Sequence, residues 1–127
     1  MTLTGKVALV TGGARGIGRS IVERLLDSGC KIMIADVLDE VGNQAASELS
    51  ARGETAYVHC DVTSAADAQN SVEKTVERFG KIDILVNNAG ITKDTLIIKM
   101  DESAWDRVLN INLKGAFLMS QAAVKVM

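Results

Sequence analysis

A glycine-rich turn near the start of the chain has the spacing of a phosphate-binding loop. It reads Thr11-Gly12-Gly13-Ala14-Arg15-Gly16-Ile17-Gly18 and follows a short apolar run. Glycines between a strand and a helix let the backbone approach a pyrophosphate, while free N–H groups and the positive end of the helix dipole face the anion. The residues that we predict to contact a dinucleotide here are Gly12, Arg15, Gly16, Ile17 and Gly18.

The same segment allows a second interpretation, as a phosphate loop of the NTPase kind. Gly13 to Ser20 reads G-x-x-x-x-G-R-S, with Arg19 at the position where that loop has lysine. A guanidinium is planar and bulkier than the compact ammonium that such loops use on terminal phosphates. A phosphate-loop NTPase therefore stays an alternative that rests on this loop alone.

An acidic residue, Asp36, ends the second apolar run. An acid about 20 residues beyond a glycine turn is placed to accept hydrogen bonds from an adenosine ribose. Its charge also repels a 2′-phosphate, so we predict that NAD(H) is favoured over NADP(H), although Arg15 could reach such a phosphate. The alternative role for Asp36 is to cap the following helix.

Composition excludes several other classes of function. The 127 residues suit one domain, and the net charge of -2 comes without a basic block, which argues against binding to nucleic acid. Cys30, Cys60 and the single histidine, His59, lack the spacing of a metal or disulfide framework, so we predict no metal site. No apolar run approaches the ~18 residues of a membrane span, and we expect a cytoplasmic protein without membrane contact.

Short apolar runs alternate with amphipathic segments along the whole chain. The alternation predicts an α/β fold with a doubly wound parallel sheet, and the chain ends on a helix that follows the fourth strand. Gly29, Gly53 and Gly80 stand where helix C-caps need left-handed residues. The predicted strands are Lys6–Thr11, Lys31–Asp36, Thr55–His59 and Ile82–Asn87.

Two predicted helices bear on the site. In the first, Ile17, Ile21 and Leu25 form the apolar stripe. The last runs from Asp101 towards Met127, with Asn112 on its apolar face among residues that include Trp105 and Met119. His59 and Cys60 must point to opposite faces of their strand, and we expect both to be packing residues.

With these features the chain resembles the N-terminal half of a short-chain dehydrogenase/reductase, which implies a Rossmann-type doubly wound parallel sheet that is truncated after its fourth strand and the helix that follows it. Thr11 to Gly18 has the family's T-G-x-x-x-G-x-G form, and Asn87-Asn88-Ala89-Gly90 matches its N-N-A-G segment. The resemblance implies that the Asp61 side chain and the Val62 amide bind adenine, and that Asn88 lies beside the adenosine ribose and braces the sheet. The further residues that it assigns to the cofactor site are Ala89 and Gly90.

The resemblance also implies a catalytic set of asparagine, serine, tyrosine and lysine, of which only Asn112 is present. The one tyrosine, Tyr57, is followed four positions later by Asp61 rather than lysine. The chain as given therefore lacks the family's tyrosine and lysine, and whether it is an enzyme by itself stays open. A non-catalytic dinucleotide-binding or assembly module is the alternative.

Within the family, the residues after Gly90 are most similar to 3-oxoacyl-[acyl-carrier-protein] reductases. The similar segments are Ile91 to Asp94, the Lys99-Met100 turn and the helix from Asp101. This implies carbonyl reduction in fatty acid biosynthesis and an acyl-carrier-protein-linked substrate. We also expect a homo-oligomer, because the fourth strand becomes a sheet edge and the helix face around Trp105 and Met119 stays uncovered.

Overall fold

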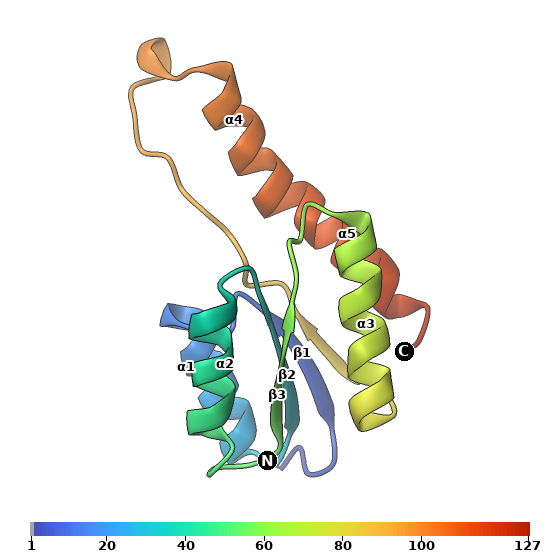
Figure 1. Ribbon diagram of the computed structural model, residues 1–127. Helices are drawn as coiled ribbons and strands as arrows, with labels where there is room; N and C mark the ends of the chain where they lie inside the picture. Colours follow the sequence, from blue (N-terminus) through green and yellow to red (C-terminus); the bar gives the residue numbers. More distant parts are fainter. Residues whose placement is uncertain (1) are drawn as a thin grey trace.

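Four parallel strands form one sheet at the centre of the structure, a computed structural model that describes residues 2–127 (Figure 1). They are β1 (Val7–Thr11), β2 (Lys31–Asp36), β3 (Thr55–His59) and β4 (Ile84–Val86). Their spatial order is β3-β2-β1-β4, so β1 lies inside the sheet and all five of its residues are buried. The predicted doubly wound α/β fold is confirmed, with β4 at one edge.

Helices cover both faces of this sheet (Figure 1). On one face α1 (Gly16–Asp27) and α2 (Asp39–Leu49) pack on Ala8 and Val10, and on the other α3 (Ala65–Phe79) and α5 (Gly115–Val124) pack around Leu9. Successive side chains of a strand point to opposite faces, so a strand covered on both faces needs apolar residues throughout. This accounts for the unbroken apolar run of β1.

The chain after β4 leaves the sheet before it returns in α5. It passes through a 3-10 turn (Ile97–Lys99), α4 (Glu102–Leu109) and a π-helical turn (Asn110–Lys114). Figure 1 shows α4 extending beyond the sheet, and none of its residues is buried. The single apolar face predicted from Asp101 onwards is therefore wrong for α4, which has no layer to pack against.

The uncovered helix face predicted around Trp105 and Met119 also needs correction. Trp105 is 56% exposed, but Met119 is fully buried. The Met119 sulfur lies 3.9 Å from both Cys60 Sγ and Ser71 Oγ. The α3–α5 contact thus covers the second half of the predicted face.

Several boundaries differ from the prediction. Lys6 precedes β1, and β4 has three residues rather than the run from Ile82 to Asn87, since it pairs with β1 only at Ala8, Leu9 and Val10. Gly29 and Gly80 have the expected positive φ, at 98° and 87°. Gly53 does not, because α2 ends at Leu49 and the chain leaves through a turn.

The buried face of α1 is displaced by one residue from the predicted stripe. Gly18, Val22 and Leu26 are buried, whereas Ile17 is 77% exposed. The helix is oriented so that Gly18, rather than Ile17, packs against Gly12 at the start of the glycine-rich turn. Ile17 is instead exposed, at the border of the cavity described below.

The described residues contain no helix that is both long and apolar enough to cross a membrane. Within residues 2–127, no group of three or more His, Cys, Asp or Glu side chains is arranged to hold a metal ion. Cys30 and Cys60 are both buried, free thiols.

Candidate functional site

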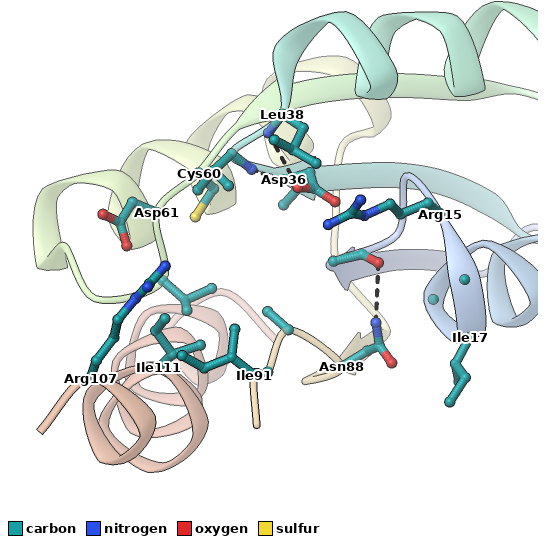
Figure 2. Close-up of a pocket in the computed structure, with 18 residues that line it drawn as sticks. Arg15, Ile17, Asp36, Leu38, Cys60, Asp61, Asn88, Ile91, Arg107 and Ile111 are labelled. Atoms are coloured by element: carbon teal, nitrogen blue, oxygen red, sulfur yellow. Dashed lines mark hydrogen bonds between the residues drawn. The ribbon is translucent and has the colours of Figure 1, made fainter. Parts of the chain in front are cut away.

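A cavity of about 610 Å³ opens at the carboxyl ends of the strands (Figure 2). This is the edge at which doubly wound sheets bind ligands, where the chain order changes direction between β1 and β4. Every cofactor-contacting residue predicted from the sequence lines it. They are Gly12, Arg15, Gly16, Ile17, Gly18, Asp36, Asp61, Val62, Asn88, Ala89 and Gly90.

The start of α1 faces this cavity with unpaired amides. The N–H groups of Gly16, Ile17 and Gly18 have no acceptor among residues 2–127, as expected for the first turn of a helix. α1 also has no acidic residue in its first turn, whereas α3 and α4 each have one and α2 has two. The positive end of α1 is therefore left available to an anion.

Two glycines of the turn serve different purposes. Gly16 has φ 59°, and a Cβ there would meet nothing within 4 Å, so the space above it is free for a ligand. A Cβ at Gly18 would collide with the Gly12 carbonyl oxygen and with Asn88 Nδ2. Gly18 is thus required for close packing, and Gly16 for its backbone conformation.

Asn88 and Thr11 hold the glycine turn against the end of β4. Asn88 Nδ2 donates to the Gly12 carbonyl at 3.1 Å, which is the bracing that the resemblance implies. The buried Thr11 hydroxyl accepts from the amides of Asn88 (3.1 Å) and Ala89 (3.0 Å) and donates to the Val86 carbonyl at 3.3 Å. Thr11 is not among the residues predicted to form the site, although a hydroxyl at the end of a buried strand indicates such a role, because a buried hydroxyl needs hydrogen-bond partners.

The Asp36 carboxylate faces the cavity and orders the loop after β2. Its Oδ1 accepts from the amides of Val37 (2.8 Å) and Leu38 (3.2 Å), and its Oδ2 lies 3.4 Å from the Ala14 amide nitrogen. Figure 2 shows the Arg15 guanidinium directed toward Asp36. A loop-ordering role at the start of α2 and a place at the cavity wall thus coexist in Asp36.

Asp61 and Val62 present polar groups at the other end of the cavity. Asp61 Oδ1 accepts from the hydroxyl (2.7 Å) and the amide (2.9 Å) of Thr63, and these two bonds lower the pKa of Asp61 below its usual 3.8. The Val62 amide has no acceptor within residues 2–127. One donor and one anionic acceptor therefore stand side by side, the combination that an adenine edge needs.

Asn112 does not line the cavity. It lies in the π-helical turn, and its side-chain amide exchanges two 2.8 Å hydrogen bonds with the backbone of Ile91. This contact anchors the segment after Gly90, so Asn112 supports the cavity wall from behind. The π-helical turn at this residue is wider than an α-helical turn and separates α4 from α5.

The structure adds cavity residues that the sequence reasoning missed. Among them are Ile91, Ile111 and Arg107, and Figure 2 shows the Arg107 side chain extending from α4 toward Asp61. No motif signals these positions, because they reach the cavity only through the path of the chain after β4. Arg19, in contrast, does not line the cavity: its Nη2 lies 2.7 Å from Glu48 Oε2 on α2, which leaves the NTPase reading without its cation.

His59 differs from its prediction. Cys60 is buried as expected for a packing residue, but His59 is exposed, and its Nδ1 lies 2.7 Å from Asp39 Oδ1. The two residues do point to opposite sides, as neighbours in an extended strand must.

Comparisons with known proteins agree with this geometry. The family model described as short chain dehydrogenase matches residues 6–127. Zerumbone synthase from Zingiber zerumbet is 46% identical over 100% of the chain, and (+)-borneol dehydrogenase 2 from Salvia officinalis is 43% identical over 100%. 3-alpha-(or 20-beta)-hydroxysteroid dehydrogenase from Mycobacterium tuberculosis is 45% identical over 98%. The chain covers 48%, 46% and 47% of these three proteins, so it spans about half the length of the curated relatives it matches.

Solved structures give the same result. A short chain dehydrogenase from Mycobacterium smegmatis superposes with a TM-score of 0.95 at 36% identity, over 98% of this chain and 53% of that one. The RhlG/NADP active-site complex of Pseudomonas aeruginosa gives a TM-score of 0.93 at 34% identity, over 98% and 49%. The motifs, the doubly wound sheet and these matches together lead to one conclusion: the chain belongs to the short-chain dehydrogenase family, of whose members it represents the NAD(P)-binding N-terminal half.

Proposed function

We propose that this chain binds NAD(H) in the 610 Å³ cavity and serves as the cofactor-binding half of an oxidoreductase that interconverts a carbonyl and an alcohol. The single observation that carries the proposal is that every predicted cofactor residue lines the same cavity. The free amides at the start of α1 and the open space at Gly16 suit a pyrophosphate, and the unpaired amide of Val62 suits an adenine ring.

Each group of residues has a distinct task in this proposal. The amides of the α1 first turn bind the pyrophosphate, and Asp36 accepts hydrogen bonds from the adenosine ribose. Asp61 and the Val62 amide hold the adenine edge, while Asn88, Ala89 and Gly90 form the opposite wall. The bound nicotinamide ring supplies the hydride donor or acceptor of the reaction.

Asn112 is the residue that we propose to take part beyond cofactor binding. Its side chain is committed to Ile91, so it fixes the wall next to the cavity. In the widened turn the Asn110 carbonyl accepts from the Gly115 N–H, five residues on, in place of the usual four-residue spacing. In the family that this chain resembles, the corresponding asparagine holds a water of the proton relay, and we propose that role here.

Selectivity for NAD(H) over NADP(H) follows from charge at the ribose end of the cavity. Asp36 carries a carboxylate at the position where a 2′-phosphate would lie, and burying two negative charges together is costly. Arg15 stands beside it and offsets part of the repulsion. We propose that the acid dominates, because three backbone amides hold it in place whereas Arg15 is exposed.

For the substrate we propose the carbonyl group of a 3-oxoacyl chain carried on acyl-carrier protein. The similarity of Ile91 to Asp94 and of the Lys99-Met100 turn to such reductases supports this choice. The hydroxysteroid and borneol dehydrogenases among the similar proteins are named for alcohol substrates, which supports carbonyl and alcohol chemistry in general.

Calorimetric titration with NADH and, separately, NADPH tests this proposal, with Asp36→Ala as the matched variant. We expect saturable binding of NADH, a weaker affinity for NADPH, and loss of about tenfold selectivity in the variant, which corresponds to 1.4 kcal/mol. Equal affinities in the wild-type chain would contradict the selectivity, and absence of binding to either nucleotide would contradict the proposed function.

A further inference from the structure

A small hydrogen-bonded cluster lies just behind the ribose end of the cavity and joins β3 to the end of β2. The single proton of the Tyr57 hydroxyl is shared between two acceptors, the Asp36 carbonyl oxygen at 2.7 Å and Asp39 Oδ1 at 2.6 Å. His59 Nδ1 lies 2.7 Å from the same Asp39 oxygen. None of these three side chains lines the cavity, so the cluster can act on a ligand only through Asp36.

The peptide group that joins Asp36 to Val37 is held on both sides. Its carbonyl oxygen accepts from the Tyr57 hydroxyl and from the Cys60 amide at 2.9 Å. Its N–H donates to the Asp36 carboxylate at 2.8 Å. The Val37 N–H of this peptide binds the Asp36 carboxylate, and the Tyr57 hydroxyl binds its carbonyl oxygen. Rotation of the peptide would therefore move the Asp36 carboxylate away from the cavity wall.

Close packing sets the position of the Tyr57 ring. A Cβ added at Gly42 would collide with ring atoms of Tyr57, so α2 approaches the ring as closely as a glycine permits. Burial of the ring, followed by its bond to Asp39, raises the pKa of the Tyr57 hydroxyl far above its usual value. The hydroxyl therefore keeps its proton and remains a donor at all working pH values.

We propose that Tyr57 is a positioning residue for cofactor selectivity: by donating to the Asp36 carbonyl it holds the Asp36 carboxylate in the orientation that accepts the two ribose hydroxyls of NAD(H). The inference rests on the proposed function, and it assigns a role to a residue that the catalytic motif does not use. Asp39 and His59 order the start of α2 but are not needed for the selectivity.

The test compares Tyr57→Phe with Asp39→Ala in the 127-residue chain. The phenylalanine keeps the ring that packs against Gly42 and removes only the hydroxyl, whereas Asp39→Ala removes the second acceptor and leaves the bond to Asp36. Calorimetry gives the dissociation constants for NADH and NADPH, and thermal unfolding verifies that each variant folds. Loss of a hydrogen bond of average strength corresponds to about fivefold in affinity.

For Tyr57→Phe we expect the NADH dissociation constant to rise about fivefold and the NADPH constant to change less than about twofold, so that the selectivity falls. Asp39→Ala should keep the wild-type selectivity within about twofold. An unchanged ratio in Tyr57→Phe, or an equal fall in both variants, would overturn the inference while leaving the proposed function intact. Failure of the wild-type chain to bind either nucleotide would overturn both.

A measurement on the unliganded wild-type chain provides a second test that needs no variant. If the Asp36–Val37 peptide is held on both sides, the Val37 amide should exchange slowly with deuterated water although Val37 itself is 51% exposed. Exchange at the rate of an unstructured peptide would contradict the proposed restraint.

Discussion

Asn112 and Ile91 form a closed pair: Asn112 Oδ1 accepts from the Ile91 N–H, and Asn112 Nδ2 donates to the Ile91 carbonyl, both at 2.8 Å. The pair joins the π-helical turn to the segment that follows Gly90. The pair ties the turn that follows α4, a helix with no buried residue of its own, to Ile91 in the cavity lining.

Replacing Asn112 by Asp should remove one of the two hydrogen bonds, the one that Asn112 Nδ2 donates to the Ile91 carbonyl. The carboxylate still accepts from the Ile91 amide but repels the Ile91 carbonyl, and we expect a loss of about 1 kcal/mol together with faster exchange of the Ile91 amide. Hydrogen exchange with mass spectrometry measures the latter. Asn110→Asp, in the same π turn, is the control, since the Asn110 side chain makes no hydrogen bond within the described part of the chain. Equal exchange in the two variants would contradict the role of the pair.

Replacing Thr11 by Val should destabilise the fold by about 2 kcal/mol, because the buried amides of Asn88 and Ala89 lose their acceptor. Urea unfolding followed by circular dichroism measures the change. Thr75→Val is a matched control, since the equally buried Thr75 hydroxyl donates only to the Ser71 carbonyl. The account requires the Thr11 variant to be clearly the less stable of the two.

Alanine at Gly18 and at Gly16 should have different effects. At Gly18 the new methyl group collides with Gly12 and with Asn88 Nδ2, and we expect a loss of more than about 2 kcal/mol and of cofactor binding. At Gly16 it meets open space, so only the positive φ is penalised, by about 1 kcal/mol. Thermal unfolding of the two variants separates collision from backbone strain. A Gly16 variant less stable than the Gly18 variant would contradict this assignment.

The pH dependence of Asp61 follows from its lowered pKa, whose main cause is the Thr63 hydroxyl, with the Thr63 amide second. A carboxyl with a depressed pKa in the folded state contributes stability above its usual 3.8, and this stability is lost as the pH falls through the folded-state pKa. In Thr63→Val the pKa of Asp61 should move up toward 3.8. Carbon-detected NMR titration of the carboxyl measures the shift, and an unchanged value would show that the hydroxyl is not its cause.

Self-association of the chain remains a prediction of the sequence analysis with a clear structural basis. β4 pairs with β1 alone, and large apolar side chains after it are exposed, among them Ile97 (87%), Ile98 (85%), Leu113 (68%) and Phe117 (59%). Such surface favours association in water. Sedimentation velocity over a range of concentrations should detect dimers or larger species. A monomer at all concentrations would contradict it.

The sequence predicts the sheet and the cavity well because both depend on strong local signals. Strands buried on both faces must be apolar, and the glycine turn with Gly12, Gly16 and Gly18 has a spacing that few other structures need. Asp36 is predicted because it ends the second strand about 20 residues beyond the glycine turn, whereas Asp61, which follows β3 by two residues, is assigned only through the family resemblance. These signals depend on residues that are close in the sequence, so they can be recognised without knowing how the helices pack.

The remaining features depend on long-range packing. Ile17 looks like part of an apolar stripe, yet the close approach of Gly18 to Gly12 leaves the Ile17 side chain exposed at the border of the cavity. Arg107 looks like a surface residue of an amphipathic helix, and only the path of the chain after β4 brings it near Asp61. The role of Tyr57 likewise depends on pairing between β2 and β3, which places it against Asp36.

The most direct test of the account is calorimetric titration of the 127-residue chain with NADH. The account predicts saturable binding with one site per chain, and the same titration of the Gly18→Ala variant should give no binding. Absence of any heat of binding from the folded wild-type chain at millimolar NADH would contradict the central claim that these residues form a cofactor site.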